Sequence, residues 1–153
     1  MKRAFTMIEL IFVIVFLAVL AAVAIPRLAA TRDDAEIAKG ASNLSILIMD
    51  LSSYYTSVGE FKSDIKWKNI TNVNLLLDNS GSAIDNTTSI NTDVFLSVKN
   101  KGCSKISVSD GIVTVSNIGT SNDTICVAFN EVKSVKKLTK THKFSGSNVK
   151  FNP

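Results

Sequence analysis

Residues 1 to 32 read MKRAFTMIELIFVIVFLAVLAAVAIPRLAATR, and this stretch decides the architecture of the chain. From Phe5 to Ile25 there are 21 residues, and only Thr6 and Glu9 among them are polar. A helix rises about 1.5 Å per residue, so a helix of this length just spans a hydrocarbon core of about 30 Å. The stretch therefore predicts a helix that crosses a membrane once.

Two ordinary interpretations compete for such an apolar run. One is an uncleaved anchor, and the other is a secretory signal peptide, for which Ala22-Val23-Ala24 supplies an Ala-x-Ala cleavage site. Lys2 and Arg3 favour a cytoplasmic N-terminus. Arg27 and Arg32 weaken that charge asymmetry on the other side. Length and charge leave both interpretations open.

Glu9 is the residue that both interpretations must explain. An acid at the centre of such a helix costs on the order of 3 kcal/mol, and it needs a partner. Cleavage between Ala4 and Phe5 would create an α-amine with a pKa of about 8, four residues before Glu9 on the same helix face. At about 4 Å and an effective dielectric constant of about 20, the two charges attract by about 4 kcal/mol. Such a pair roughly offsets the cost of burying the acid.

The segment Ala4-Phe5-Thr6-Met7-Ile8-Glu9-Leu10 resembles the processing signal of type IV prepilins. The resemblance implies that prepilin peptidase cuts between Ala4 and Phe5 and that Phe5 is then N-methylated. The glutamate of that family falls on Glu9, and its helix-bending proline falls on Pro26. Two features depart from the family pattern: Ala4 stands where Gly is usual, and the leader of four residues is short.

The function implied by this resemblance is mechanical. We expect a type IV filament subunit in a bacterial inner membrane, with a cytoplasmic N-terminus, a periplasmic head and no enzymatic activity. The short chain and plain head favour a type II secretion or competence pseudopilin. Its expected partners are other pilin-like subunits, prepilin peptidase, the inner-membrane assembly platform and the lipid bilayer. Glu9 would set the register by pairing with the Phe5 amine of a neighbour.

A second function class stays open beside this one. The chain is then a periplasmic binding domain that is exported by an ordinary signal peptide or held by a single membrane anchor. The mass of the mature N-terminus separates the two hypotheses.

The chain is expected to fall into four segments. These are a leader at 1–4, a transmembrane helix at 5–25, an amphipathic continuation at 26–58 and a head at 59–153. An apolar residue recurs every three or four positions in the continuation, as on one face of a helix. This stripe consists of Ile37, Ala41, Leu44, Ile48, Leu51, Tyr55 and Val58.

Three residues are expected to interrupt or end this long helix. Pro26 lacks a backbone N–H and should kink or locally unwind it. Gly40 costs about 1 kcal/mol relative to alanine and marks a soft point. Gly59 is expected to end the helix.

The head is expected to be an antiparallel sheet packed on the helix, so that the fold class is α+β. Residues 105–109 and 112–116 alternate apolar and polar side chains and flank Asp110-Gly111, a strong hairpin signal. Residues 60–92 read as a long connection that is packed onto the core by Trp67. A short helix is expected at 73–77, a third strand at 124–129 and extended pieces around Phe144 and at 149–151.

Cys103 and Cys126 are the only two cysteines. One even pair in an exported domain suggests a disulfide that closes a loop of 22 intervening residues. The spacing lacks the paired Cys-x-x-Cys arrangement of a zinc site.

The C-terminal segment is basic. From position 131 onwards six lysines stand against one acid, a local charge of +5. Such a segment can attract DNA, but aromatic residues for base stacking are few, so a solvated strand edge is the favoured interpretation. The lysines are Lys133, Lys136, Lys137, Lys140, Lys143 and Lys150.

No catalytic, cofactor or metal site is expected. His142 is the only histidine and has no evident partner in the sequence. Asp93, Asp110 and Asp123 are conceivable calcium ligands, but their spacing does not form an EF-hand loop.

Overall fold

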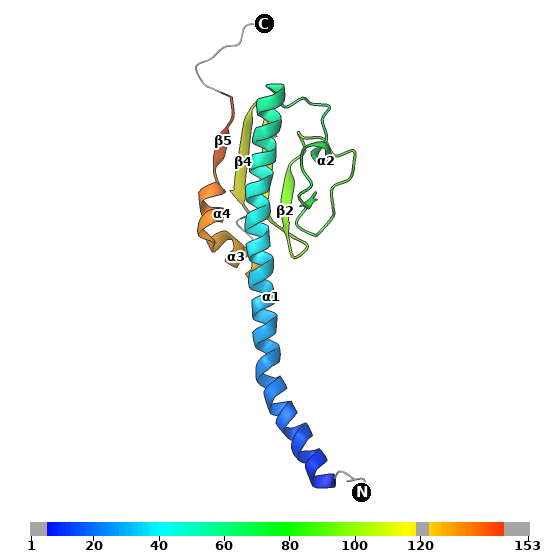
Figure 1. Cartoon of the computed structure of the whole chain (residues 1–153). Helices are drawn as coiled ribbons and strands as arrows, with labels where there is room; N and C mark the ends of the chain where they lie inside the picture. Colours follow the sequence, from blue (N-terminus) through cyan, green and yellow to red (C-terminus); the bar gives the residue numbers. More distant parts are fainter. Residues whose placement is uncertain (1–5, 119–122, 146–153) are drawn as a thin grey trace. The chain divides into compact units, whose positions relative to one another are not determined.

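The computed structural model describes residues 6–118 and 123–145. It divides into two compact units, residues 1–35 and 36–153. The long helix α1 (Met7–Val58) contributes residues to both units. In the second unit α1 is followed by a five-stranded antiparallel sheet and short helices (Figure 1). The predicted α+β class is confirmed.

The first unit consists of the N-terminal part of α1. The helix α1 is continuous through Pro26, so no unwound segment lies there. Proline lacks the N–H that would bond the carbonyl of residue 22, so the helix loses one backbone hydrogen bond at this point. A kink at Pro26 stays a prediction.

The sheet of the second unit has the order β1-β2-β3-β4-β5, and each strand is antiparallel to its neighbours. Two tight turns connect its central strands. Lys99 and Asn100 link β2 to β3, and Asp110 and Gly111 link β3 to β4, all four with positive φ. Such turns match the right-handed twist of the strands they connect. The strands are β1 (Leu75–Leu76), β2 (Val94–Val98), β3 (Lys101–Ser109), β4 (Ile112–Asn117) and β5 (Thr141–Lys143).

The hydrophobic core lies between α1 and the sheet. Leu44, Leu47 and Leu51 are fully buried. The predicted stripe is therefore confirmed at Ala41, Leu44 and Leu51, and the core also includes Leu47, which was not predicted. The other predicted members are half-buried, at Ile37, Ile48 and Tyr55, or exposed, at Val58. Val58 is exposed at the end of α1, and Gly59 follows it with a φ of 87°. A positive φ favours glycine, which explains why the helix ends where the sequence predicted.

Gly40 has a packing role in addition to its low helix propensity. A Cβ atom at this position would lie 2.7 Å from Cγ2 of Val98 and 3.2 Å from Cε2 of Phe129. Only a residue without a side chain allows α1 to approach β2 this closely. The interpretation of Gly40 as a soft point therefore missed the main constraint on it.

The predicted strand at 124–129 is wrong, because these residues form the helix α3 (Thr124–Glu131). Asp123 caps the helix by accepting a hydrogen bond from the N–H of Ile125 at 2.9 Å. Cys126 and Phe129 are buried at helical spacing. Both edges of β4 are already paired, with β3 and β5, so β4 offers no free edge to another strand.

The expectations for the connection between α1 and the sheet need two corrections. The segment 73–77 contains the short strand β1, and the short helix is α2 (Trp67–Ile70) instead. Leu75 and Leu76 pair with Leu96 and Phe95 of β2, a strand that the sequence interpretation did not include. Pairing with β2, which is distant in sequence, outweighs the local helix preference that was predicted for 73–77.

Trp67 packs the connection onto the core, as predicted. Its side chain is fully buried, and its indole N–H donates to the carbonyl of Thr92 at 3.0 Å. Near the C-terminus, β5 lies directly before Phe144, and Phe144 packs against the core. The expected extended piece at 149–151 lies outside the described residues.

Candidate functional site

Glu9 lies at the start of α1 and forms a capping box with Thr6. The carboxylate Oε2 accepts hydrogen bonds from the backbone N–H of Thr6 at 2.9 Å and from its hydroxyl at 2.8 Å. In return, the Thr6 hydroxyl accepts from the N–H of Glu9 at 3.3 Å. This reciprocal arrangement satisfies backbone donors that a helix start otherwise leaves unpaired. Thr-x-x-Glu is a recognisable capping signal, and the sequence interpretation missed it.

The capping box leaves part of the Glu9 carboxylate unused. Both bonds end on Oε2, and among the described residues none donates to Oε1. An ionised carboxylate accepts hydrogen bonds on both oxygens. Glu9 can therefore cap its own helix and accept from a second donor. Ala4 and Phe5, the predicted processing residues, lie outside the described residues.

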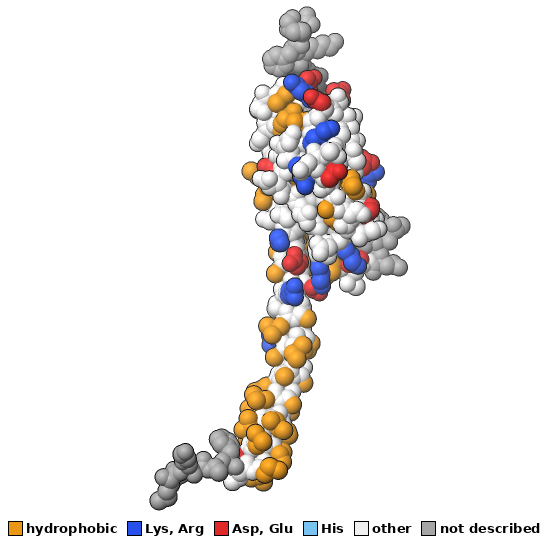
Figure 2. Space-filling model, turned by 90° about the vertical axis from the view of Figure 1, so that its right-hand side faces the viewer, with side chains coloured by type: hydrophobic (Ala, Val, Ile, Leu, Met, Phe, Trp, Pro, Cys, Tyr) orange, Lys and Arg blue, Asp and Glu red, His pale blue; other side chains and the backbone are white. Residues whose placement is uncertain are grey.

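The helix surface that follows Glu9 is apolar and exposed. Every large hydrophobic side chain from Met7 to Leu28 is exposed, with exposed fractions between 45% and 79%. Figure 2 shows hydrophobic side chains gathered over this part of α1, whereas charged side chains lie over the head. By length and composition α1 is able to cross a membrane. The apolar stretch of α1 is not buried within the chain, in contrast to the later part of α1 that lines the core of the head.

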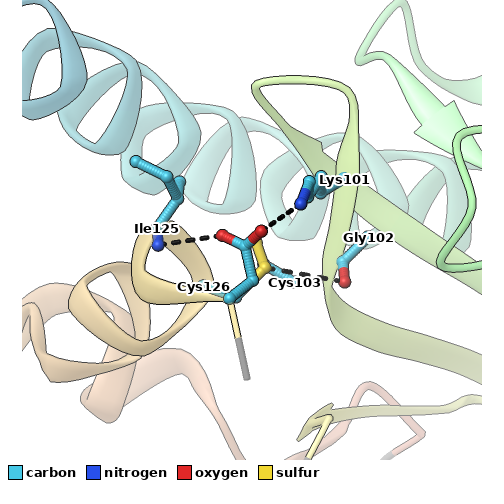
Figure 3. A network of polar contacts seen from close by, with 6 residues as sticks. Lys101, Gly102, Cys103, Ile125 and Cys126 are labelled. Atoms are coloured by element: carbon cyan, nitrogen blue, oxygen red, sulfur yellow. Dashed lines mark hydrogen bonds and ion pairs between the residues drawn. A yellow bond between two sulfur atoms is a disulfide. The ribbon is translucent and has the colours of Figure 1, made fainter. Parts of the chain in front are cut away.

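The head contains one disulfide, between Cys103 of β3 and Cys126 of α3, with a Cα–Cα distance of 4.9 Å. The predicted pairing is confirmed. Asp123 holds the same junction, because it forms an ion pair with Lys101 while it caps α3 by accepting from Ile125. Figure 3 shows Lys101 and Ile125 on either side of the disulfide. The hydrogen bond from Lys101, together with the N–H of Ile125, lowers the pKa of Asp123 below its ordinary value. The bridge, the ion pair and the cap attach α3 to the sheet.

Replacing both cysteines with serine is expected to lower the free energy of unfolding of the head by about 3 kcal/mol in the chain-entropy model. The bridge closes a loop with a sequence separation of 23 residues, so its loss frees the unfolded chain. Denaturant unfolding of the two proteins measures the difference. Peptide mapping of exported protein without reductant is the control, and two free thiols there would contradict the disulfide.

The three aspartates considered as calcium ligands have separate surroundings. Asp93 pairs with Lys105 at 2.7 Å, and hydrogen bonds from Lys105 and Ser107 lower its pKa. Asp110 lies in the turn between β3 and β4, and Asp123 caps α3. Within 6–118 and 123–145, no group of three His, Cys, Asp or Glu side chains is positioned to hold a metal ion.

Within its described part, residues 131–145, the basic segment is helical from Lys133 to Leu138, so its interpretation as a lysine-rich strand edge is only partly right. Lys150 lies outside the described residues. The helix α4 (Lys133–Leu138) carries Lys133, Lys136 and Lys137, whereas Lys143 lies on the edge strand β5. Lys136 pairs with Glu131 at 2.5 Å, an exposed contact that contributes little to stability.

His142 is half-buried rather than exposed. Its ring Nε2 lies 2.8 Å from the carbonyl oxygen of Leu138, and its backbone pairs with Val113 of β4. The first contact joins β5 to the end of α4, and the second joins it to β4. The histidine therefore has a structural position between the last two elements of the head.

Comparison with known proteins adds no assignment. No family model matches the chain, and no curated protein or solved structure is significantly similar to it.

Proposed function

We propose that this chain is a structural subunit of a type IV filament, and within that class a type II secretion or competence pseudopilin. The observation that carries the proposal is the position of Glu9. Its carboxylate stands at the beginning of an exposed apolar helix, and among the described residues nothing donates to its second oxygen. The processing signal at residues 4–10 supplies such a donor after cleavage.

The exposed apolar surface suits two successive environments. A helix that is apolar on all sides is stable where lipid or other apolar helices surround it. In this proposal lipid covers the surface of the inner-membrane subunit before assembly. In the filament, the equivalent helices of neighbouring subunits replace the lipid, so the same side chains serve both states.

Glu9 makes the transfer between these states selective. A carboxylate in an apolar environment costs on the order of 3 kcal/mol unless it is paired. The free amine of a neighbouring Phe5 would donate to Oε1 without disturbing the Thr6 cap on Oε2. One axial register between neighbours then pairs every acid, and other registers leave acids unpaired.

The properties of the head agree with a periplasmic position. Disulfides form and persist in oxidising compartments such as the bacterial periplasm. The bridge between Cys103 and Cys126 attaches α3 to the sheet.

Mass spectrometry of the natively produced protein is expected to find a chain that begins at Phe5 and carries one added methyl group on its N-terminus. The physical reason is that the Glu9 carboxylate needs a cationic partner near the helix start. Substituting Ala4 with a bulky residue should block the cleavage and leave the four-residue leader attached.

The same measurement identifies the competing function. A mature chain that begins at Ile25 would identify a secreted periplasmic domain and contradict the filament proposal. A chain that keeps Met1 in cells with active prepilin peptidase would contradict it as well.

A further inference from the structure

A polar cleft of about 660 Å³ lies in the second unit, beside α2 and β1. One wall is formed by residues 68–75, which follow Trp67, and the other by residues 83–86. Clefts of this size accommodate small ligands. The proposed assembly role does not use this part of the head.

The side chains around the cleft have unused hydrogen-bonding groups. Among the described residues, none forms a hydrogen bond or ion pair with the side chains of the four lining asparagines or Lys68. Each carboxamide supplies both donors and an acceptor. Lys68 adds one positive charge, and the Asp85 carboxylate, which stands beside Asn86 on the second wall, is already bonded by Thr87 and Thr88. The four asparagines are Asn69, Asn72, Asn74 and Asn86.

Hydrogen bonds hold both walls in place. The Thr71 hydroxyl donates to the Asp50 carboxylate of α1 at 2.6 Å, which fastens the first wall to the long helix. On the second wall, Asp85 accepts bonds from the hydroxyls of Thr87 and Thr88, each at 2.8 Å. These bonds, that from Thr87 foremost, lower the pKa of Asp85 to about 2. A site whose walls are already ordered loses less conformational entropy when it binds a ligand.

The shape of the sheet edge disfavours an extended peptide as the occupant. Peptides commonly bind by adding a strand to a free sheet edge. Here residues 82–84 already cover the outer edge of β1. The N–H of Ile84 donates to the carbonyl of Leu75 at 3.2 Å, and the N–H of Leu77 donates to that of Ser82 at 2.7 Å.

We propose that the cleft binds a short acidic oligosaccharide. The asparagine amides would exchange hydrogen bonds with sugar hydroxyl groups, which both donate and accept. Lys68 would pair with the carboxylate of a sugar acid, and the aliphatic side chains of Val73 and Ala83 would contact the C–H face of a sugar ring. The proposal does not depend on filament assembly.

Isothermal titration of the full-length protein in nanodiscs tests this site. The probe is a tetrasaccharide of alternating N-acetylglucosamine and glucuronic acid, and saturable binding is expected. Replacing Asn72 and Asn86 together with alanine should weaken binding about tenfold or more, because each amide contributes at least one net hydrogen bond. Asn91→Ala, an exposed asparagine outside the cleft, is the matched control and should bind as the unaltered protein does.

Two further arms test the charge and the source of the ligand. Lys68→Gln should weaken binding of the acidic probe but not that of its carboxyl-reduced neutral form. A long polymer of the same repeat should bind each site as tightly as the tetrasaccharide if the cleft takes internal sugars of a surface polysaccharide. Weaker binding of the polymer would instead identify a free oligosaccharide as the ligand.

Three outcomes would overturn the proposal. The first is the absence of saturable binding to the tetrasaccharide. The second is equal affinity of the double variant and the unaltered protein. The third is binding of an acidic extended peptide at this cleft without binding of the sugar. None of these outcomes bears on the N-terminal processing test, so the two proposals fail independently.

Discussion

Glu9→Gln is expected to abolish filament incorporation while the protein still inserts in the membrane and its head still folds. Glutamine at this position keeps a side-chain acceptor for the N–H and hydroxyl of Thr6, so the helix start remains capped. What it loses is the negative charge that would pair with a neighbouring Phe5 amine. That attraction is about 4 kcal/mol at about 4 Å, and each subunit in the filament would lose it. Shearing and quantifying filaments from cells that express only the variant measures the effect.

Two companion variants separate assembly from helix capping. Thr6→Ala removes the capping hydroxyl but keeps the Glu9 charge, so filaments should still form. Glu9→Val removes both the cap and the charge and should match Glu9→Gln in its assembly defect. If Glu9→Gln assembles normally and only the variants that lose the cap fail, Glu9 has a structural role in its own helix and the register proposal is wrong.

Trp67→Ala is expected to lower the free energy of unfolding of the head by about 4 kcal/mol. The side chain is fully buried in the core, and large-to-small changes of this kind remove its buried apolar surface and leave a cavity. The change also removes the indole N–H that bonds the carbonyl of Thr92 at 3.0 Å. Domains of this kind are stable by only about 5–15 kcal/mol, so the variant loses a large share of its stability.

The choice of spectroscopic probe for the Trp67 variants is limited by the single tryptophan of the chain. Trp67 is the only tryptophan, so unfolding is followed by far-UV circular dichroism in denaturant and not by tryptophan fluorescence. Trp67→Phe keeps an aromatic ring and loses the N–H, and it should be intermediate. Val127→Ala changes an exposed apolar side chain and should leave the stability within about 0.5 kcal/mol. Equal stability of Trp67→Ala and Val127→Ala would contradict the assigned core.

Where the sequence interpretation was right, the signal was local. The hairpin at Asp110-Gly111 depends on two adjacent residues that adopt positive φ, and the end of α1 depends on Gly59. The disulfide needed only the count of two cysteines and the expectation that the domain is exported. Each of these features is decided by a few neighbouring residues or by composition, so no tertiary information was needed.

The interpretation failed for two kinds of reason. It missed two local capping signals, Thr6 with Glu9 and Asp123, and the latter caps a helix although residues 124–129 are rich in residues that favour strands. Elsewhere, residues distant in sequence decided the outcome. Leu75 and Leu76 form a strand because β2 lies beside them. The cleft asparagines had no motif in common, and only the fold gathered them on two facing walls.

The sequence by itself determined that an apolar helix leads into an α+β head. A helix of 21 residues with only two polar side chains is unfavourable in water and needs an apolar environment. The apolar stripe of an amphipathic helix must likewise be covered by another layer of the fold. The tertiary structure alone decided the partners. It filled the space at Gly40 with Val98 and Phe129, and it paired Leu75 and Leu76 with β2. The physical reason is that hydrophobic periodicity determines which surface is buried, whereas the shape and pairing of the covering residues determine what that surface meets.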